Sequence, residues 1–380
     1  MTGTERIEAA LSPRGTVEIP AVICYEGIYC RDHWDELTSL PWWYRVSTDL
    51  EHQLAWRTVA AAATPQDWFQ IVTLPSRQAR QAVRIETRGD EVVRVDARTG
   101  REERLIRPCV GGWVPQIAVS DREVAELPHS ASDVDAAVGP GEPFHDRRFA
   151  REGRADLARA LMDGPCKGLF PLASVSSPLW GCYSLWGFEG MMTLVADRPD
   201  LVARACGRLL DHRIRQVREA AALGAAGIWI EECLTDMIAP AAFESLNLPF
   251  LGRLIDQIRA CGMKSIYYYC GDPAGKWDAI LSAAADALAL EEGKKGFEID
   301  IHDVVRRVGG RCALLGNLDA IGVLGGAHEP PLRAAIADQV AAGRANGGRF
   351  ITSIGSPVTP GTSVERVRTY LDLAHELGRA

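Results

Sequence analysis

The chain lacks the features that mark membrane and secreted proteins. No apolar stretch in its 380 residues approaches the roughly 20 that a helix needs to cross a bilayer. Residues 1–20 carry acidic side chains and no apolar core, so we expect no secretory signal. The ten cysteines form no CxxC pair and show no spacing typical of a disulfide scaffold. We therefore expect a cytoplasmic protein with reduced thiols and no membrane partner.

Positive charge and the common nucleotide-binding motifs are also missing. The net charge of -8 argues against a nucleic acid or an anionic membrane surface as a partner. No GxGxxG, GxxxxGK[ST] or GxSxG motif is present. These absences argue against the commonest nucleotide-binding and acyl-transfer sites.

The sequence does contain a regular alternation of strand-length and helix-length segments from about residue 160 onward. This alternation is typical of repeated βα units around a parallel sheet. It predicts a (β/α)8 TIM barrel that spans residues 1–380 as a single domain. The predicted strands are 17–24, 168–173, 227–232, 264–270, 287–291, 311–315 and 349–354, and the predicted helices are 49–63, 199–222, 240–260, 273–285, 300–308, 331–346 and 363–377.

Residues 82–105 interrupt this pattern in the N-terminal half. Apolar and polar residues alternate there around two turn sequences, Arg88-Gly89-Asp90 and Arg98-Thr99-Gly100. The segment predicts an inserted β-meander, which we place in a β-rich subdomain over residues 64–130.

Polar side chains follow successive predicted strands, where the catalytic groups of a barrel lie. They include Glu232, Cys270, Glu291, Asn317 and Asp319. A single acid there often only caps the next helix, and a single cysteine often packs as a small hydrophobe. A shared ligand explains the recurrence better, because an isolated buried carboxylate costs several kcal/mol.

Three of these side chains could form a metal site. Glu232, Cys270 and Glu291 are predicted to hold a divalent ion with one open position, and a thiolate with carboxylates favours zinc. The side-chain period of two places Glu232 and Glu231 on opposite faces of their strand. Aromatic residues in 25–29, 42–44 and 180–186 are candidates to line a pocket, although core packing explains them equally well.

The order of these motifs resembles the C-terminal half of the uroporphyrinogen decarboxylase superfamily. The resemblance rests on residues 230–240, Tyr268-Tyr269-Cys270-Gly271, residues 285–291, Gly316-Asn317-Leu318-Asp319 and Ser353-Ile354-Gly355-Ser356. The superfamily contains decarboxylases that need no cofactor and corrinoid-linked methyltransferases that use zinc.

Departures from the family patterns favour the second branch. True decarboxylases carry an Arg-rich N-terminal motif and a later His, whereas residues 1–27 lack that motif and Ser356 stands in the place of the His. Thiol-methylating members have a His-x-Cys-Gly strand end and a later Cys as zinc ligands; here Tyr268 and Ser356 replace two of them and Cys270 remains. The β-meander resembles an insertion in members linked to demethylation. The resemblance therefore implies a corrinoid-dependent methyltransferase, or demethylase.

The leading hypothesis is an enzyme that moves a methyl group from a small O-, N- or S-methylated substrate to cobalamin or a corrinoid protein. A metal at the barrel mouth would polarise the methyl-bearing heteroatom. Tyr268 or Asp319 would position or protonate the leaving group, and Asn317 and Ser356 would contact the cofactor. The alternatives are a cofactor-free decarboxylase or lyase acting on a different substrate, with Asp319, Glu232 and Tyr268 as its working groups, and a non-catalytic binding subunit.

Overall fold

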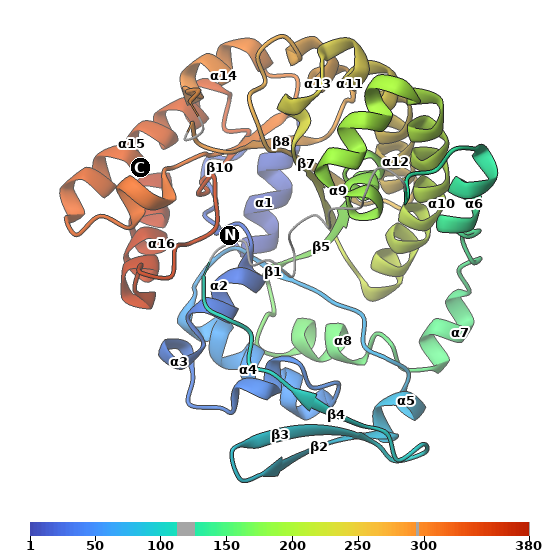
Figure 1. Ribbon diagram of the computed structural model, residues 1–380. Helices are drawn as coiled ribbons and strands as arrows, with labels where there is room; N and C mark the ends of the chain where they lie inside the picture. The colour runs from blue at the N-terminus through green and yellow to red at the C-terminus, as the bar shows by residue number, and fades with distance from the viewer. Residues whose placement is uncertain (112–125, 294–295, 380) are drawn as a thin grey trace.

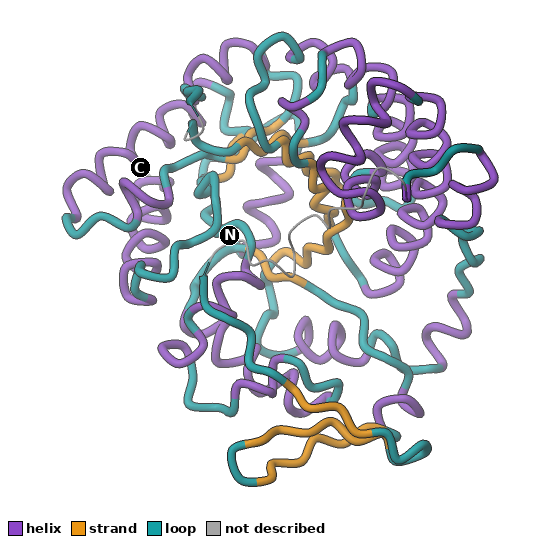
Figure 2. Tube along the Cα trace, in the orientation of Figure 1, coloured by secondary structure: helices purple, strands orange, loops and turns teal. Residues whose placement is uncertain are grey.

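The computed structural model describes residues 1–111, 126–293 and 296–379. Parallel strands form a seven-stranded sheet in the order β1-β5-β6-β7-β8-β9-β10. The sheet curls into an arc with helices around its outside (Figures 1 and 2), which confirms the predicted α/β barrel. The strands are β1 (Trp68–Gln70), β5 (Phe170–Ser176), β6 (Gly227–Glu232), β7 (Lys264–Tyr269), β8 (Ala287–Leu290), β9 (Ala313–Leu315) and β10 (Phe350–Ile351).

The helices follow the strands in the expected alternation. None of the described helices is both long and apolar enough to cross a membrane. These helices include α4 (Leu50–Ala63), α9 (Pro178–Asp197), α10 (Pro199–Leu223), α14 (Ile301–Val308), α15 (Glu329–Ala345) and α16 (Val364–Arg379). The predicted helix over 240–260 is two helices, α11 (Pro240–Leu246) and α12 (Leu248–Ala260). They are divided at the fully buried Asn247, whose amide binds a carboxylate of the barrel.

The predicted β-meander is confirmed. Strands β2 (Val83–Arg88), β3 (Glu91–Asp96) and β4 (Glu102–Leu105) pair antiparallel in a three-stranded sheet of their own. Figure 1 shows this sheet away from the barrel strands, below α4. The wider subdomain over residues 64–130 stays a prediction, and its residues 112–125 lie outside the described part of the chain.

The first predicted strand, over residues 17–24, forms only one isolated bridge, between Ala21 and Thr352 next to β10. The backbone hydrogen bonds there run from Val22 N to Thr352 O at 2.9 Å and from Thr352 N to Pro20 O at 2.8 Å. The opposite side of this segment faces the short strand β1, which was not predicted from the sequence because it has only three residues. This segment takes the place of an eighth strand between β10 and β1.

Side chains complete the pairing on the β1 side. Asp67 N donates to Ala21 O at 3.0 Å, and the Asp67 carboxylate accepts a hydrogen bond from Ala21 N at 2.7 Å. Ile23 N donates to Gln66 Oε1 at 3.0 Å. Because backbone groups must find partners when they are buried, these two side chains close the barrel where no regular ladder forms.

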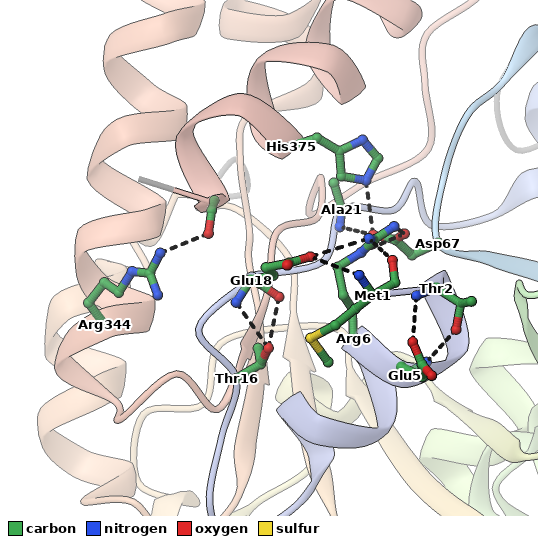
Figure 3. Close-up of polar contacts among 11 residues, drawn as sticks. Met1, Thr2, Glu5, Arg6, Thr16, Glu18, Ala21, Asp67, Arg344 and His375 are labelled. Carbon is green, nitrogen blue, oxygen red and sulfur yellow. Dashed lines mark hydrogen bonds and ion pairs between the residues drawn. The ribbon is translucent and has the colours of Figure 1, made fainter.

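Asp67 also binds both terminal helices (Figure 3). Arg6 of α1 (Gly3–Leu11) donates to it at 2.5 and 3.1 Å, and His375 Nε2 of α16 lies 3.0 Å from Asp67 Oδ2. The side chain is 1% exposed. Burial alone would raise the pKa of Asp67, but the hydrogen bonds from His375 and Arg6 outweigh burial and hold the pKa below its usual value. The carboxylate therefore joins the start of the chain to its end.

We predict that Asp67→Ala lowers the free energy of unfolding by about 3–5 kcal/mol, because it removes a buried carboxylate that pairs with Arg6 and binds Ala21 N and His375. Urea denaturation followed by circular dichroism measures the change. Asp135→Ala is the matched control, since Asp135 pairs with Arg204 on the surface and should cost under about 1 kcal/mol. Equal, small losses in the two variants would contradict the structural role of Asp67.

Candidate active site

Strand alternation decides which side chains enter the barrel. In β6, Trp229 faces the interior, where its ring lies 6.0 Å from Trp68 of β1 and 5.0 Å from Tyr268 of β7, between centroids. Glu231 shares this face and Glu232 takes the other. The carboxylate that reaches the barrel mouth is therefore Glu231.

A cavity of about 200 Å³ opens beside these rings. Its walls carry the rings of Tyr25, Trp68 and Trp229 and the carboxylates of Glu26 and Glu231. Strands β1, β5 and β6 each contribute a residue near their C-terminal ends, as expected for a barrel active site. The remaining lining residues are Ile23, Gly27, Ile28, Gln70, Leu172 and Ser174.

The two carboxylates of the cavity have different surroundings. Glu26 accepts hydrogen bonds from Gln70 N at 3.0 Å and Gln66 Nε2 at 3.4 Å; burial raises its pKa, and Arg57 opposes the rise. Glu231 accepts from the Tyr25 hydroxyl at 3.4 Å, and burial raises its pKa as well. A nearby guanidinium thus balances Glu26, whereas the polar groups found at Glu231 are uncharged.

Thiols and carboxylates form a chain of contacts next to this cavity. The Cys233 thiol donates to Glu231 Oε1 at 3.8 Å, and the Cys270 thiol donates to Glu291 Oε2 at 3.5 Å. Cys233 and Cys270 also contact each other, and this neighbour, followed by burial, raises the pKa of Cys233 well above its ordinary value. The ends of β6, β7 and β8 therefore present two linked pairs of sulfur and oxygen donors.

Two of the three predicted metal ligands are brought together. Cys270 and Glu291 are in contact, whereas Glu232 points away from the barrel interior. Within residues 1–111, 126–293 and 296–379, no group of three or more His, Cys, Asp or Glu side chains is arranged to hold a metal ion. A metal-binding role for Cys270 and Glu291 stays a prediction.

Glu232 lies between β6 and the surrounding helices and is fully buried. Its carboxylate accepts hydrogen bonds from Ser177 Oγ at 2.7 Å, Asn247 Nδ2 at 2.7 Å and the Tyr267 hydroxyl at 3.4 Å. Ser177 caps the N-terminus of α9, and Asn247 separates α11 from α12. Glu232 therefore fastens two helical segments to the barrel.

Tyr268 and Ser356, two further predicted site residues, lie near the thiols. The Tyr268 hydroxyl donates to Gly355 O at 3.1 Å, which fixes the ring that stacks on Trp229. A Cβ on Gly355 would lie 2.5 Å from Glu292 N, so this close approach requires glycine. Ser356 Oγ donates to Glu292 Oε2 at 2.7 Å.

Asn317 and Asp319, by contrast, have structural partners: Asn317 binds residues before α14 and on α15, and Asp319 binds the backbone of its own loop. Asn317 Nδ2 donates to Ile299 O at 2.9 Å, and Asn317 Oδ1 accepts from Gln339 Nε2 at 3.1 Å. Asp319 accepts from the backbone nitrogens of Ile321 and Gly322 at 2.8 and 2.9 Å and caps the short helix η4 (Ala320–Leu324). Both side chains stabilise the β9 loop.

Glu231, Cys233 and Glu26 were not among the site residues predicted from the sequence. One regularity accompanies the inner face: an aromatic residue stands two positions before a polar one at the ends of β1, β6 and β7. The pairs are Trp68 with Gln70, Trp229 with Glu231, and Tyr268 with Cys270.

Glu232 predicts a pH-dependent stability. Burial raises its pKa to about 7 in the folded protein, from 4.5. Between pH 4.5 and about 7, the folded state therefore keeps a proton on Glu232 that the unfolded state has lost. The contribution of Glu232 to stability is complete below pH 4.5 and is lost as the pH rises through about 7. Relative to Glu232→Gln, which cannot titrate, the wild type should lose on the order of 3 kcal/mol between pH 4 and 8. Urea denaturation of both proteins across this range measures the difference, and a constant difference would contradict the prediction.

Comparisons with known proteins agree with this architecture. A structure described as a methyltransferase from Methanosarcina mazei superimposes with a TM-score of 0.67 at 14% identity and covers 99% of both chains, which supports the fold alone. A uroporphyrinogen decarboxylase of Anaeromyxobacter sp. is 27% identical over 258 residues, covering 67% of this chain and 70% of its own. One from Hahella chejuensis is 26% identical over 223 residues, covering 55% and 60%.

The family model for uroporphyrinogen decarboxylase (URO-D) matches residues 166–377. This range contains β5 to β10, and with them Glu231, Cys270 and Glu291 of the barrel mouth. The chain belongs to the uroporphyrinogen decarboxylase family.

Proposed function

We propose that this protein is a corrinoid-dependent methyltransferase that takes a methyl group from a small methylated compound. The observation that carries the proposal is the charge of the cavity. Its walls hold two carboxylates, and no Lys or Arg lines it among the described residues. A substrate with several carboxylates would be repelled by such a site.

Cavity size supports the same choice. The volume of about 200 Å³ is below the roughly 300–1,000 Å³ of pockets that hold drug-sized ligands. A small methylated compound suits this space better than a tetrapyrrole. A decarboxylase or lyase acting on a different substrate is the second candidate, favoured by the names of the related sequences.

In the proposed mechanism, the reaction takes place in the cavity at the mouth of the barrel. A reduced corrinoid, bound as cofactor or carried by a partner protein, would supply the nucleophile for the methyl group. The rings of Tyr25, Trp68 and Trp229 hold the donor and exclude water, which strengthens electrostatic contacts in the site. Tyr268 holds Trp229 in place through their stacked rings, and its hydroxyl is the candidate proton donor to an oxygen leaving group. Burial raises the pKa of this hydroxyl well above its ordinary value, so it would suit a strongly basic alkoxide rather than a thiolate.

The other site residues have narrower roles in this proposal. Ser356 follows Gly355, which Tyr268 contacts, and stays the candidate cofactor contact. Asn317 and Asp319 support the β9 loop, and we assign them no chemical step. Zinc binding by Cys270 and Glu291 is part of the proposal because thiolate and carboxylate are suitable ligands. Their donor atoms do not enclose an ion in the described residues, so no step depends on it.

The zinc part of the proposal predicts about one zinc per chain in protein purified without chelator or His-tag. Cys270→Ala should lose this zinc, because it removes the thiolate. Cys312→Ala, another buried thiol that precedes β9 at the opposite end of the strands, should keep it. Elemental analysis measures the zinc content of the three proteins. Equal zinc content in all three would contradict the assignment of Cys270.

Methyl transfer itself is tested by mixing the protein with reduced cobalamin and a panel of O-, N- and S-methylated compounds. We expect the absorbance of cobalamin to change to that of its methylated form with at least one donor. Glu231→Gln removes a carboxylate from the cavity wall and should lower kcat/KM by about tenfold or more. A tenfold change corresponds to the loss of an interaction of about 1.4 kcal/mol. No methylation with any donor, together with release of CO2 from a carboxylated substrate, would favour the second candidate.

A further inference from the structure

The rings around the cavity form a corner. Trp68 stands at 89° to Trp229 with centroids 6.0 Å apart, and Tyr25 stands at 73° to Trp229 with centroids 6.1 Å apart. Tyr268 stacks on Trp229 at an interplanar angle of 23° and fixes the central ring. These rings lie in nearly perpendicular planes and surround a small volume from different directions. A flat aromatic ligand does not require such an arrangement.

The two carboxylates at this corner differ in the charge of the groups found beside them. Glu26 faces Arg57, whose guanidinium lies over the ring of Trp56 at 4.4 Å and donates to Gln70 O at 3.3 Å. Glu231 contacts the Tyr25 hydroxyl and the Cys233 thiol, and no Lys or Arg of the described residues lines its cavity. Glu231 is half-buried, and an ionised carboxylate is costly to remove from water without a positive partner. A cationic ligand would therefore complete this site.

We propose that the cavity binds a methylated ammonium group, with Tyr25, Trp68 and Trp229 as its aromatic walls and Glu231 as its counter-ion. Aromatic rings attract such cations through their negative faces, and Trp does so most strongly. The cavity of about 200 Å³ suits a compact trimethylammonium head. This inference rests on the proposed methyl transfer and names the class of donor, an N-methylated cation.

The chemistry of such a donor agrees with the groups at the site. Removal of one methyl group from such a donor would break one C–N bond, and a reduced corrinoid would supply the electron pair of the new bond to the methyl carbon. The bonding pair of the broken bond stays on nitrogen, so the product is a neutral tertiary amine and no proton is consumed. Tyr268, whose hydroxyl is bound to Gly355 O, is then needed as a positioning residue only.

Calorimetric titration with choline and with 3,3-dimethylbutan-1-ol tests the inference. The second compound has the shape of choline with carbon in place of the charged nitrogen. We expect choline to bind at least tenfold more tightly to the wild type. Equal affinity for the two compounds, or binding of neither, would overturn the cation site.

Matched variants locate the effect. Glu231→Gln should weaken choline binding about tenfold and leave the affinity for the neutral compound unchanged. Glu232→Gln makes the same change at the next residue, on the opposite strand face, and should leave both affinities unchanged. Trp229→Phe keeps an aromatic core residue and should weaken choline binding more than neutral binding. A loss of choline affinity in Glu232→Gln equal to that in Glu231→Gln would show that Glu231 is not the counter-ion.

The binding test needs neither corrinoid nor metal, so its outcome is separate from that of the methyl-transfer assay. Methyl transfer from O- or S-methylated compounds without choline binding would overturn only the cation site. Choline binding with no methylation of cobalamin by any donor would overturn the proposed function and leave the site in place.

Discussion

Asp67 accepts hydrogen bonds from the first helix, from the segment that replaces an eighth strand, and from the last helix. The barrel depends on this carboxylate, because the ends of a curled sheet otherwise expose unpaired backbone groups. Side-chain oxygens of Asp67 and Gln66 accept hydrogen bonds from Ala21 N and Ile23 N, in place of the backbone of a neighbouring strand. With the sheet held closed, its strand ends converge on one mouth.

The alternation of side chains along β6 then gives two adjacent carboxylates different roles. Glu231 enters the mouth and meets the aromatic cavity, whereas Glu232 fastens the N-terminus of α9 and the break between α11 and α12. A carboxylate that is fully buried and hydrogen-bonded by three side chains is suited to a structural role. A half-buried carboxylate beside a cavity is suited to meet a ligand.

The charge of the cavity connects the family to the proposed chemistry. The related sequences are named as decarboxylases, yet the carboxylates and aromatic rings of this cavity favour a small cation over a polyanion. The same barrel can serve both substrates, because function in this fold depends on the side chains at the strand ends. The thiol and carboxylate pairs, Cys233 with Glu231 and Cys270 with Glu291, place sulfur and oxygen atoms at neighbouring strand ends.

Sequence periodicity by itself determined the barrel, the β-meander and most elements, because apolar periods of two and of about four residues are local properties of the chain. It also placed Cys270 and Glu291 at neighbouring strand ends. Only the tertiary structure decided which of Glu231 and Glu232 enters the mouth, since both faces of a barrel strand are buried and alternation alone does not name the inner one. Strand β1 was likewise beyond local patterns, because it has only three residues. The break at Asn247 does have a local signal, Pro249 in the first turn of α12, which the predicted helix over 240–260 did not take into account. Closure by Asp67 depended on contacts over 46 and 308 residues of sequence, which no periodicity records.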